Sequence, residues 1–321
     1  MSNWLTPISE TAKSTLNIIK SIGPLLISQS NFASEAYARH LLRLASVEAA
    51  KELVNQEIDI YSKAKEQLIQ RYIDADQVER IRIKRDLEDI ESNVRSLNIA
   101  ATAMNYLSLE QNSAEKVSDS QETSSLDQKE ISPHWLDKFN ELSRSRNEDW
   151  RANLLSCALA VESRRPGTVS PRALWLLGTL EEPIFKAFAT ILDLSSFIGS
   201  GLMIPDSEVT LLQKPVPNCE LGDTVSIGRL VYLLSDIGVL AESLTTQRSF
   251  PQGSKFSVKY HSFHYCIECL SNPLTVEGVI LTPLGSSLAS FYSRNFNPLG
   301  AEIFQAWINS LDRNHFLVTK L

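Results

Sequence analysis

Cysteine, glycine and long apolar runs are all scarce in this chain of 321 residues. The cysteines are too few and too unevenly placed for a disulfide framework in a chain of this size: Cys157, Cys219, Cys266 and Cys269. A reducing compartment fits this usage, and we predict a cytoplasmic protein. The hydrophobic content of 43% is nevertheless typical of a globular protein that buries a core.

Common catalytic and nucleotide-binding motifs are absent as well. The chain has no Gly-x-x-x-x-Gly-Lys-Ser/Thr loop, no Gly-x-Gly-x-x-Gly after a strand, no His-Glu-x-x-His and no Gly-x-Ser-x-Gly. Neighbouring carboxylates such as Asp86 and Asp89 fit a solvated helix face better than acid–base catalysis. We therefore expect a non-enzymatic protein that needs no cofactor.

Positive charge is in deficit, with a net charge of -7. This balance argues against an electrostatic grip of the whole protein on nucleic acid or anionic lipid. Arginines nevertheless gather locally, and Arg164, Arg165 and Arg172 are the candidates for phosphate or nucleic-acid contact. No aromatic residues interleave for base stacking, so the alternative is that Arg172 pairs with Glu162 while the others face solvent or a partner.

No run is apolar enough for a signal peptide or a membrane span. The nearest is Leu16 to Ile27, which Lys20, Gly23 and Pro24 interrupt. This segment is predicted to pack on its own chain. The alternative is a short helix that lies on a membrane surface or in the groove of a partner.

Neither glycine nor proline occurs between Asn31 and Leu109, which predicts long helices broken only at Asp74-Ala75-Asp76. After this break, apolar residues alternate in steps of four and three, which is the a/d pattern of a coiled coil. The predicted interaction seam consists of Ile83, Leu87, Ile90, Val94, Leu97, Ala101 and Met104.

This seam needs a partner helix. The preceding helix can supply it by folding back at Asp74, or a second copy of the protein can supply the same helix. Self-association is favoured because the preceding helix lacks an equally regular seam. We predict a homo-oligomer that also contacts another protein.

Two helices joined at Arg164-Arg165-Pro166-Gly167 are predicted between Asn147 and Leu180. Pro166 and Gly167 end the first helix, and Ser170-Pro171 starts the second as N-cap and first helical residue. Upstream, an acidic, polar segment at 110–131 predicts a flexible linker. Order is expected to return with a helix that starts at Ser132-Pro133.

Beyond the hinge, helices and strands are predicted to mix. Strands are expected at 202–204, 256–267 and 276–281, and helix starts at Asp223, Thr282-Pro283 and Asn297-Pro298. The order helix, β-ribbon, helix resembles a winged helix. Because Arg229 is the only basic residue of the presumed recognition helix, protein contact is favoured over base reading.

One cluster has the ligand types of a metal site: His261, His264, Cys266 and Cys269. These residues lie on a predicted strand, where alternation directs Cys266 and Cys269 to opposite faces. No second cysteine pair completes a usual zinc site. Ordinary strand packing is therefore favoured over zinc binding.

Residues around the hinge resemble the core pattern of the bacterial family called domain of unknown function 2806. The matching pieces are Trp135-Leu136-x-x-Phe139, Leu159-Ala160-Val161-Glu162, Pro166-Gly167-Thr168-Val169-Ser170, Arg172-Ala173-Leu174, Leu233-Leu234-x-x-Ile237-Gly238-Val239-Leu240 and Leu281-Thr282-x-x-Gly285. The chain departs from the family at Leu155, where a tryptophan is usual. The resemblance, which extends to Abi-alpha-like abortive infection proteins, implies a role in anti-phage defence by analogy alone.

These patterns together predict a mainly α protein. A long helical coiled-coil region precedes a helical core domain with a small winged-helix-like α+β part. The expected function is an interaction, scaffold or sensor protein; a membrane-associating effector and a nucleic-acid binder are the alternatives. The predicted segments are 1–30, an N-terminal segment; 31–109, the coiled-coil region; 110–131, the linker; 132–197, the hairpin core; and 198–321, the C-terminal domain.

Overall fold

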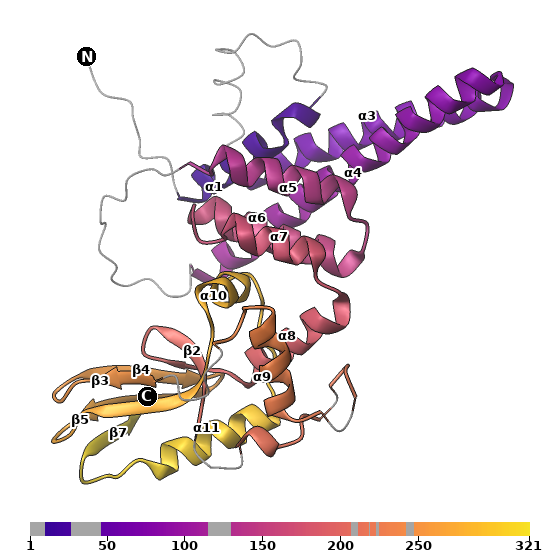
Figure 1. The fold of residues 1–321 in the computed structure, drawn as a ribbon. Helices are drawn as coiled ribbons and strands as arrows, with labels where there is room; N and C mark the ends of the chain where they lie inside the picture. Colours follow the sequence, from indigo (N-terminus) through magenta and orange to yellow (C-terminus); the bar gives the residue numbers. More distant parts are fainter. Residues whose placement is uncertain are drawn as a thin grey trace, which may run out of the picture. The chain divides into compact units, whose positions relative to one another are not determined.

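The computed structural model describes residues 10–26, 46–114, 130–206, 211–217, 219–222, 225–241 and 247–321 (Figure 1). The chain divides into two compact units, Met1–Gly178 and Thr179–Leu321. Unit 1 is helical and unit 2 combines helices with an antiparallel sheet, as expected in outline. The division falls at Gly178 rather than at 131 and 197, because the helices Pro133–Ser145 and Asp149–Arg164 pack against the long helix Gln77–Ala114.

Two long helices form an antiparallel arm in unit 1, α3 (Val47–Asp74) and α4 (Gln77–Ala114). The break predicted at Asp74-Ala75-Asp76 is confirmed. Asp76 Oδ1 accepts a hydrogen bond of 2.8 Å from the backbone N–H of Glu79, which satisfies one of the free donors at the start of α4. Figure 1 shows that the arm extends away from the other helices of its unit.

The remaining helices of unit 1 gather around the carboxyl-terminal part of α4. They are α1 (Glu10–Ile22), η1 (Gly23–Leu25), α5 (Pro133–Ser145), α6 (Asp149–Arg164) and α7 (Pro171–Thr179). Ser132 occupies the N-cap position of α5, as predicted, although its side chain makes no capping hydrogen bond. The N-cap residue of α6 is Glu148 rather than Asn147.

The apolar residues of the N-terminal segment lie inside this unit. Ile18, Ile19 and Ile22 are fully buried, and Leu26 is nearly so. Their burial removes apolar surface from water, which stabilises the unit. The prediction that this segment packs on its own chain is confirmed for residues 16–26, and Ile27 lies outside the described residues. No helix in the described part of the chain is both long and apolar enough to cross a membrane.

Unit 2 is built on a seven-stranded antiparallel sheet of order β3-β6-β2-β1-β4-β5-β7. Its elements are α8 (Glu182–Leu194), β1 (Ser196–Ile198), β2 (Gly201–Pro205), η3 (Leu211–Gln213), α9 (Ile227–Asp236), β3 (Gln247–Phe250), β4 (Lys255–Tyr260), β5 (Phe263–Cys269), β6 (Leu274–Ile280), α10 (Pro283–Ala289), α11 (Pro298–Ser310) and β7 (Phe316–Lys320). One predicted strand, 256–267, is in fact a hairpin that turns at His261, whose φ is 47°.

Helix α11 covers one face of this sheet. Its Phe304, Trp307 and Ile308 pack with Ile267 and Cys269 of β5 and with apolar residues of the other strands. The predicted helix starts are confirmed: the side chain of Thr282 caps α10 and the side chain of Asn297 caps α11. Asp223 lies outside the described residues, and α9 begins after Ser226.

Candidate functional site

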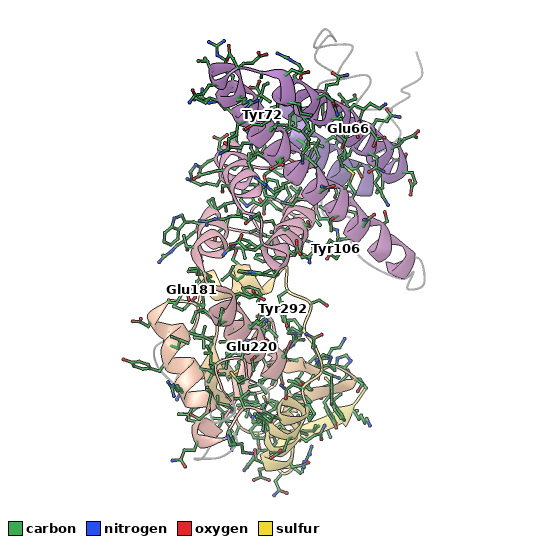
Figure 2. All side chains as sticks on the ribbon, turned by 90° about the vertical axis from the view of Figure 1, so that its right-hand side faces the viewer. Glu66, Tyr72, Tyr106, Glu181, Glu220 and Tyr292 are labelled. Atoms are coloured by element: carbon green, nitrogen blue, oxygen red, sulfur yellow. The ribbon has the colours of Figure 1, made fainter. Side chains whose placement is uncertain are left out.

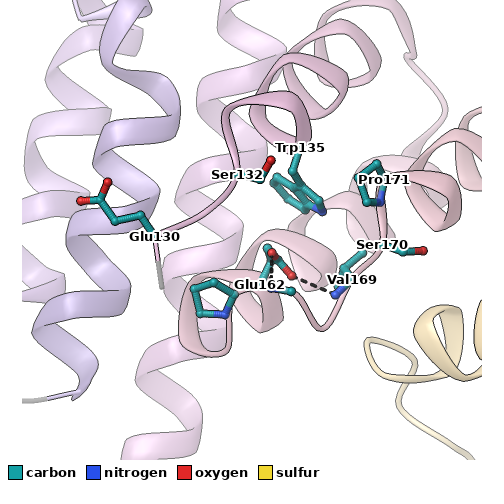
Figure 3. A pocket seen from close by; sticks show the side chains of 9 residues that line it. Glu130, Ser132, Trp135, Glu162, Val169, Ser170 and Pro171 are labelled. Carbon is teal, nitrogen blue, oxygen red and sulfur yellow. Dashed lines mark hydrogen bonds between the residues drawn. The ribbon is translucent and has the colours of Figure 1, made fainter. Parts of the chain in front are cut away.

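A cavity of about 430 Å³ lies at the hinge of unit 1 (Figure 3). Its volume is within the usual range of small-molecule sites. The start of α5, the end of α6, and the turn that leads into α7 form its wall. The lining residues are Glu130, Ser132, Trp135, Glu162, Pro166, Gly167, Val169, Ser170 and Pro171.

Glu162 fixes the hinge from inside, because its carboxylate accepts hydrogen bonds from the turn it faces. The backbone N–H of Gly167 lies 2.6 Å from Oε1 and that of Val169 lies 2.8 Å from Oε2. Gly167 has a φ of 93°, which glycine adopts at little cost. Burial raises the pKa of the Glu162 carboxyl, and the backbone hydrogen bonds act in the opposite direction.

This geometry shows that the ion pair suggested between Arg172 and Glu162 is wrong. Glu162 is 2% exposed and both of its oxygens serve backbone N–H groups, whereas Arg172 lies at the exposed side of α7. A buried carboxylate gains more from several fixed backbone donors than a mobile exposed arginine offers. Glu162 therefore holds the turn, and Arg172 projects toward solvent.

Trp135 brings a different feature to the same cavity. Its indole is 1% exposed and stacks on Phe139, with 5.3 Å between the ring centroids. The Nε1 atom is buried without a hydrogen-bond acceptor. An unsatisfied buried donor costs about 1–3 kcal/mol. Such a cost is uncommon in native cores and marks a position where an acceptor is missing.

The mouth of the cavity is acidic. Glu130 is exposed and forms an ion pair with Lys20, whose Nζ lies 2.7 Å from Oε1. The hydrogen bond from Lys20 lowers the pKa of Glu130, so this carboxyl stays ionised. With Glu162 deeper inside, the lining holds two carboxyl groups and no basic side chain. It therefore disfavours an anionic ligand.

The predicted arginine candidates do not form one site around this cavity. Arg164 and Arg165 are exposed at the end of α6, and Arg172 is exposed on α7; none of them lines the cavity. Another arginine of the region, Arg151, is buried: its Nε donates to the carbonyl of Leu177 over 2.9 Å, and its guanidinium pairs with Glu148. Arg151 therefore links α6 to α7 and has a structural role.

The interaction seam of α4 finds its partner in the same chain. Ile83, Leu97 and Met104 are buried, while Leu87, Ile90 and Val94 are half-buried, and α3 packs along the helix. Folding back, one of the two predicted alternatives, therefore describes the arm. Self-association stays a prediction, and the apolar surface available for it lies elsewhere on the arm.

The metal candidates are divided between the two faces of β5 and its turn. Cys269 is fully buried in the sheet core, whereas Cys266 and His264 are half-buried on the other face and His261 lies in the turn. The predicted alternation of Cys266 and Cys269 is confirmed. Among the described residues, no group of three or more His, Cys, Asp or Glu residues is placed to hold a metal ion. All four cysteines are free thiols.

Residues that line the hinge cavity were not predicted as a site. The sequence indicated Trp135 only through the family resemblance, and Glu162 through that resemblance and as an ion-pair partner for Arg172. The available signal was their chemistry: a tryptophan N–H and a carboxyl group at apolar helical positions both need partners when they are buried.

No family model, no curated protein and no solved structure matches this chain.

Proposed function

We propose that this protein is a non-enzymatic interaction protein that associates with a second copy of itself through the end of its arm. The observation that carries this proposal is a group of exposed apolar side chains at the turn between α3 and α4. Ile73, Val78 and Ile81 are 62%, 61% and 63% exposed. Ile69 and Tyr72 continue the surface on α3, and Tyr72 can be followed in Figure 2. We call these five residues the arm tip.

The arm tip is held in place by contacts across the turn. Arg71 and Glu79 form an ion pair of 2.9 Å between α3 and α4. Arg80 donates to the carbonyl of Ile73 over 3.2 Å and lies over the ring of Tyr72. Apolar side chains on a fixed support lose little conformational freedom on association, which favours a specific partner.

The charges around the arm tip favour a second copy as the partner. Residues 66–86 contain five acidic and five basic side chains. In a two-fold symmetric pair, the same surface meets itself, so charges of both signs can find opposite charges. A nucleic acid or an anionic membrane offers only negative charge and gains no net attraction from this balanced surface.

The alternatives receive less support from the structure. Membrane contact through the N-terminal segment requires Ile18, Ile19 and Ile22 to leave the core of unit 1. Unit 1 would then lose the free energy that the burial of these side chains contributes. Nucleic-acid binding rests on exposed Arg164 and Arg165, which belong to a chain of net charge -7. Salt-sensitive binding that is lost when both become alanine is its distinguishing result.

Two finer parts of the proposal concern cellular role and the C-terminal unit. The role in anti-phage defence is proposed from the family resemblance alone. A winged-helix arrangement of unit 2 is supported by the order of α9, the following strands and α10. The exposed Tyr232 on α9, 81% accessible, favours protein contact at that helix over base reading.

Light scattering after size exclusion tests self-association on the whole chain. The double substitution Ile73→Asp and Ile81→Asp places charges on the arm tip, and we expect the molar mass of the oligomer to fall to that of a monomer. Both side chains are more than 60% exposed, so the fold should be retained. A monomeric wild type at tens of micromolar would reject the proposal.

The matched control changes an exposed apolar residue outside the arm. Trp175→Asp alters a side chain of α7 that is 56% exposed. We expect the oligomer to persist in this variant. Loss of the oligomer in the control but not in the arm-tip variant would place the interface on α7 and contradict the proposal.

A further inference from the structure

The hinge cavity combines three features that together define a ligand. Trp135 offers a buried N–H without an acceptor, Glu162 and Glu130 offer carboxylate oxygens, and Pro166 and Pro171 offer apolar ring faces. We propose that this cavity binds a small uncharged cyclic amide, a planar ring with a carbonyl beside an N–H, as in a nucleobase. This inference is independent of self-association at the arm tip.

Because Trp135 Nε1 lacks an acceptor, one edge of the ligand should carry a hydrogen-bond acceptor. Trp135 Nε1 can only donate, so the group that completes it must accept. Figure 3 shows the indole facing the space near Ser170 and Pro171. Because Nε1 exposes less than 1 Å² of surface, the lining has to open slightly before a carbonyl oxygen reaches the atom. The hydrogen bond then removes the cost of an orphan donor, a gain that a hydrocarbon ligand cannot supply.

The carboxyl groups of Glu162 and Glu130 indicate that the opposite edge of the ligand carries an N–H donor and that the ligand is uncharged. The two oxygens of Glu162 offer about four lone-pair sites, and the backbone N–H groups of Gly167, Thr168 and Val169 use three of them, so one can still accept from a ligand N–H. Glu130 at the mouth is ionised beside Lys20. These carboxylates repel an anionic ligand, whereas they do not repel an uncharged amide. A free base should therefore bind better than the same base with a phosphate.

Shape and size fit a single ring or a fused pair of rings. The two prolines and Val169 present apolar surface to the cavity, and flat rings stack well on such walls. A cavity of about 430 Å³ holds a small ligand and excludes a folded peptide segment. The turn that Glu162 fixes would then sense whether the ligand is present.

Nitrogen-15 labelling of the tryptophan indoles tests the proposal at the atom concerned. The chain has five tryptophans, and the resonance of Trp135 is assigned as the one missing in Trp135→Phe. We expect uracil or hypoxanthine to shift this resonance in the wild-type protein. The resonance of Trp175, which is 56% exposed, should stay in place. No shift of Trp135 with either base would overturn the proposal.

Two related probes test the chemistry of the edges. We expect 1,3-dimethyluracil, which keeps the carbonyls but has no N–H, to bind at least tenfold more weakly than uracil. We also expect uridine monophosphate to bind about tenfold more weakly than uridine. Equal or tighter binding of either probe would contradict the role of the carboxylates.

A second variant covers the case in which Trp135→Phe does not fold. Ser132 is exposed at the cavity mouth and makes no capping hydrogen bond, so Ser132→Tyr can block the entrance without loss of a native contact. We expect this variant to fold, to remain an oligomer if the wild type is one, and to lose the uracil-induced shift. An unchanged shift in Ser132→Tyr would place the ligand outside the cavity.

Discussion

The hinge of unit 1 buries the carboxyl group of Glu162, and unit 2 half-buries that of Asp193; both carboxyl groups accept hydrogen bonds from the backbone. In the hinge, Glu162 accepts from Gly167 and Val169 beside a cavity. In unit 2, Asp193 accepts from the N–H of Asn295 over 2.7 Å, and the hydroxyl of Tyr292 lies 3.3 Å from its other oxygen. Burial raises the pKa of both carboxyl groups.

The two regions differ in what remains unsatisfied. The Tyr260 hydroxyl near Asp193 lies 2.7 Å from the carbonyl of Asn297 and accepts from its N–H over 3.0 Å. In the hinge, Trp135 keeps a donor without an acceptor. A satisfied network makes a region rigid, whereas an orphan donor beside a cavity leaves a place for a ligand. The Asp193 carboxyl group therefore belongs to a network that stabilises unit 2, whereas the surroundings of Glu162 contain the cavity proposed to bind a ligand.

The largest expected effect is in the satisfied network. Tyr260→Phe removes the hydroxyl that joins the end of α8 to the start of α11, so the carbonyl of Asp193 and the N–H of Asn297 each lose this hydrogen bond. We expect a loss of about 3 kcal/mol in the free energy of unfolding. Urea denaturation followed by the fluorescence of Trp307, which lies in unit 2, measures it.

Tyr265→Phe is the matched control for this substitution. Within the described residues, the Tyr265 hydroxyl hydrogen-bonds to the half-buried side chain of Gln305, at 3.4 to 3.5 Å. We expect a change below about 0.5 kcal/mol. Equal losses in the two variants would show that the network is not what stabilises unit 2.

A smaller loss is expected at the hinge. Glu162→Gln keeps one acceptor but directs an amide N–H₂ toward a backbone donor, and we expect a loss of about 2 kcal/mol. Amide hydrogen exchange at Gly167 and Val169 reports this loss locally and should become faster. Glu141→Gln, at an exposed ion pair of α5, is the control and should leave both rates unchanged.

The raised pKa of Glu162 adds a pH dependence of known sign. In the unfolded chain this carboxyl ionises near its ordinary pKa, whereas the folded hinge keeps the proton to higher pH. The stability it contributes is complete below the ordinary pKa and is lost as pH rises through the raised value. Glu162→Gln should remove this loss. A wild type and variant whose stabilities follow parallel pH profiles above the ordinary pKa of glutamate would contradict the assignment.

The smallest effect is expected at high pH in unit 2. Burial, followed by the nearby charge of Asp193, raises the pKa of Tyr292 to about 12. Because the unfolded state ionises near pH 10 and the folded state near 12, stability should fall across this window. Tyr292→Phe should remove that part of the fall. Absorbance titration of the phenols checks it directly, and a Tyr292 that titrates near 10 in the folded chain would refute it.

Local signals in the sequence predicted much of the fold. The break at Asp74 and the helix starts at Ser132, Thr282 and Asn297 follow from capping and proline chemistry, which acts within a few residues. Strands β3 and β7 were missed because they are short and pair with segments 24 or more residues away. The turn at His261 was missed because the residue adopts a left-handed conformation without glycine or asparagine.

The sites depended on information that the sequence does not carry. A heptad seam requires a partner but does not state whether it comes from the same chain. The pairing of Glu162 with Arg172 was predicted from charge, whereas burial and the N–H groups of the turn decided the contact. A cavity arises from how three helices meet, so no single segment of the sequence reveals it.

Helix α4 runs without interruption from the arm into the helices of unit 1, where α1, α5 and α6 contact it. Such a helix acts as a lever. Between Gln77 and Leu97 it spans about 30 Å, so a rotation of about 10° at the base displaces the far end by about 5 Å. A partner that grips the far end can therefore exert torque on the region where α5 and α6 converge.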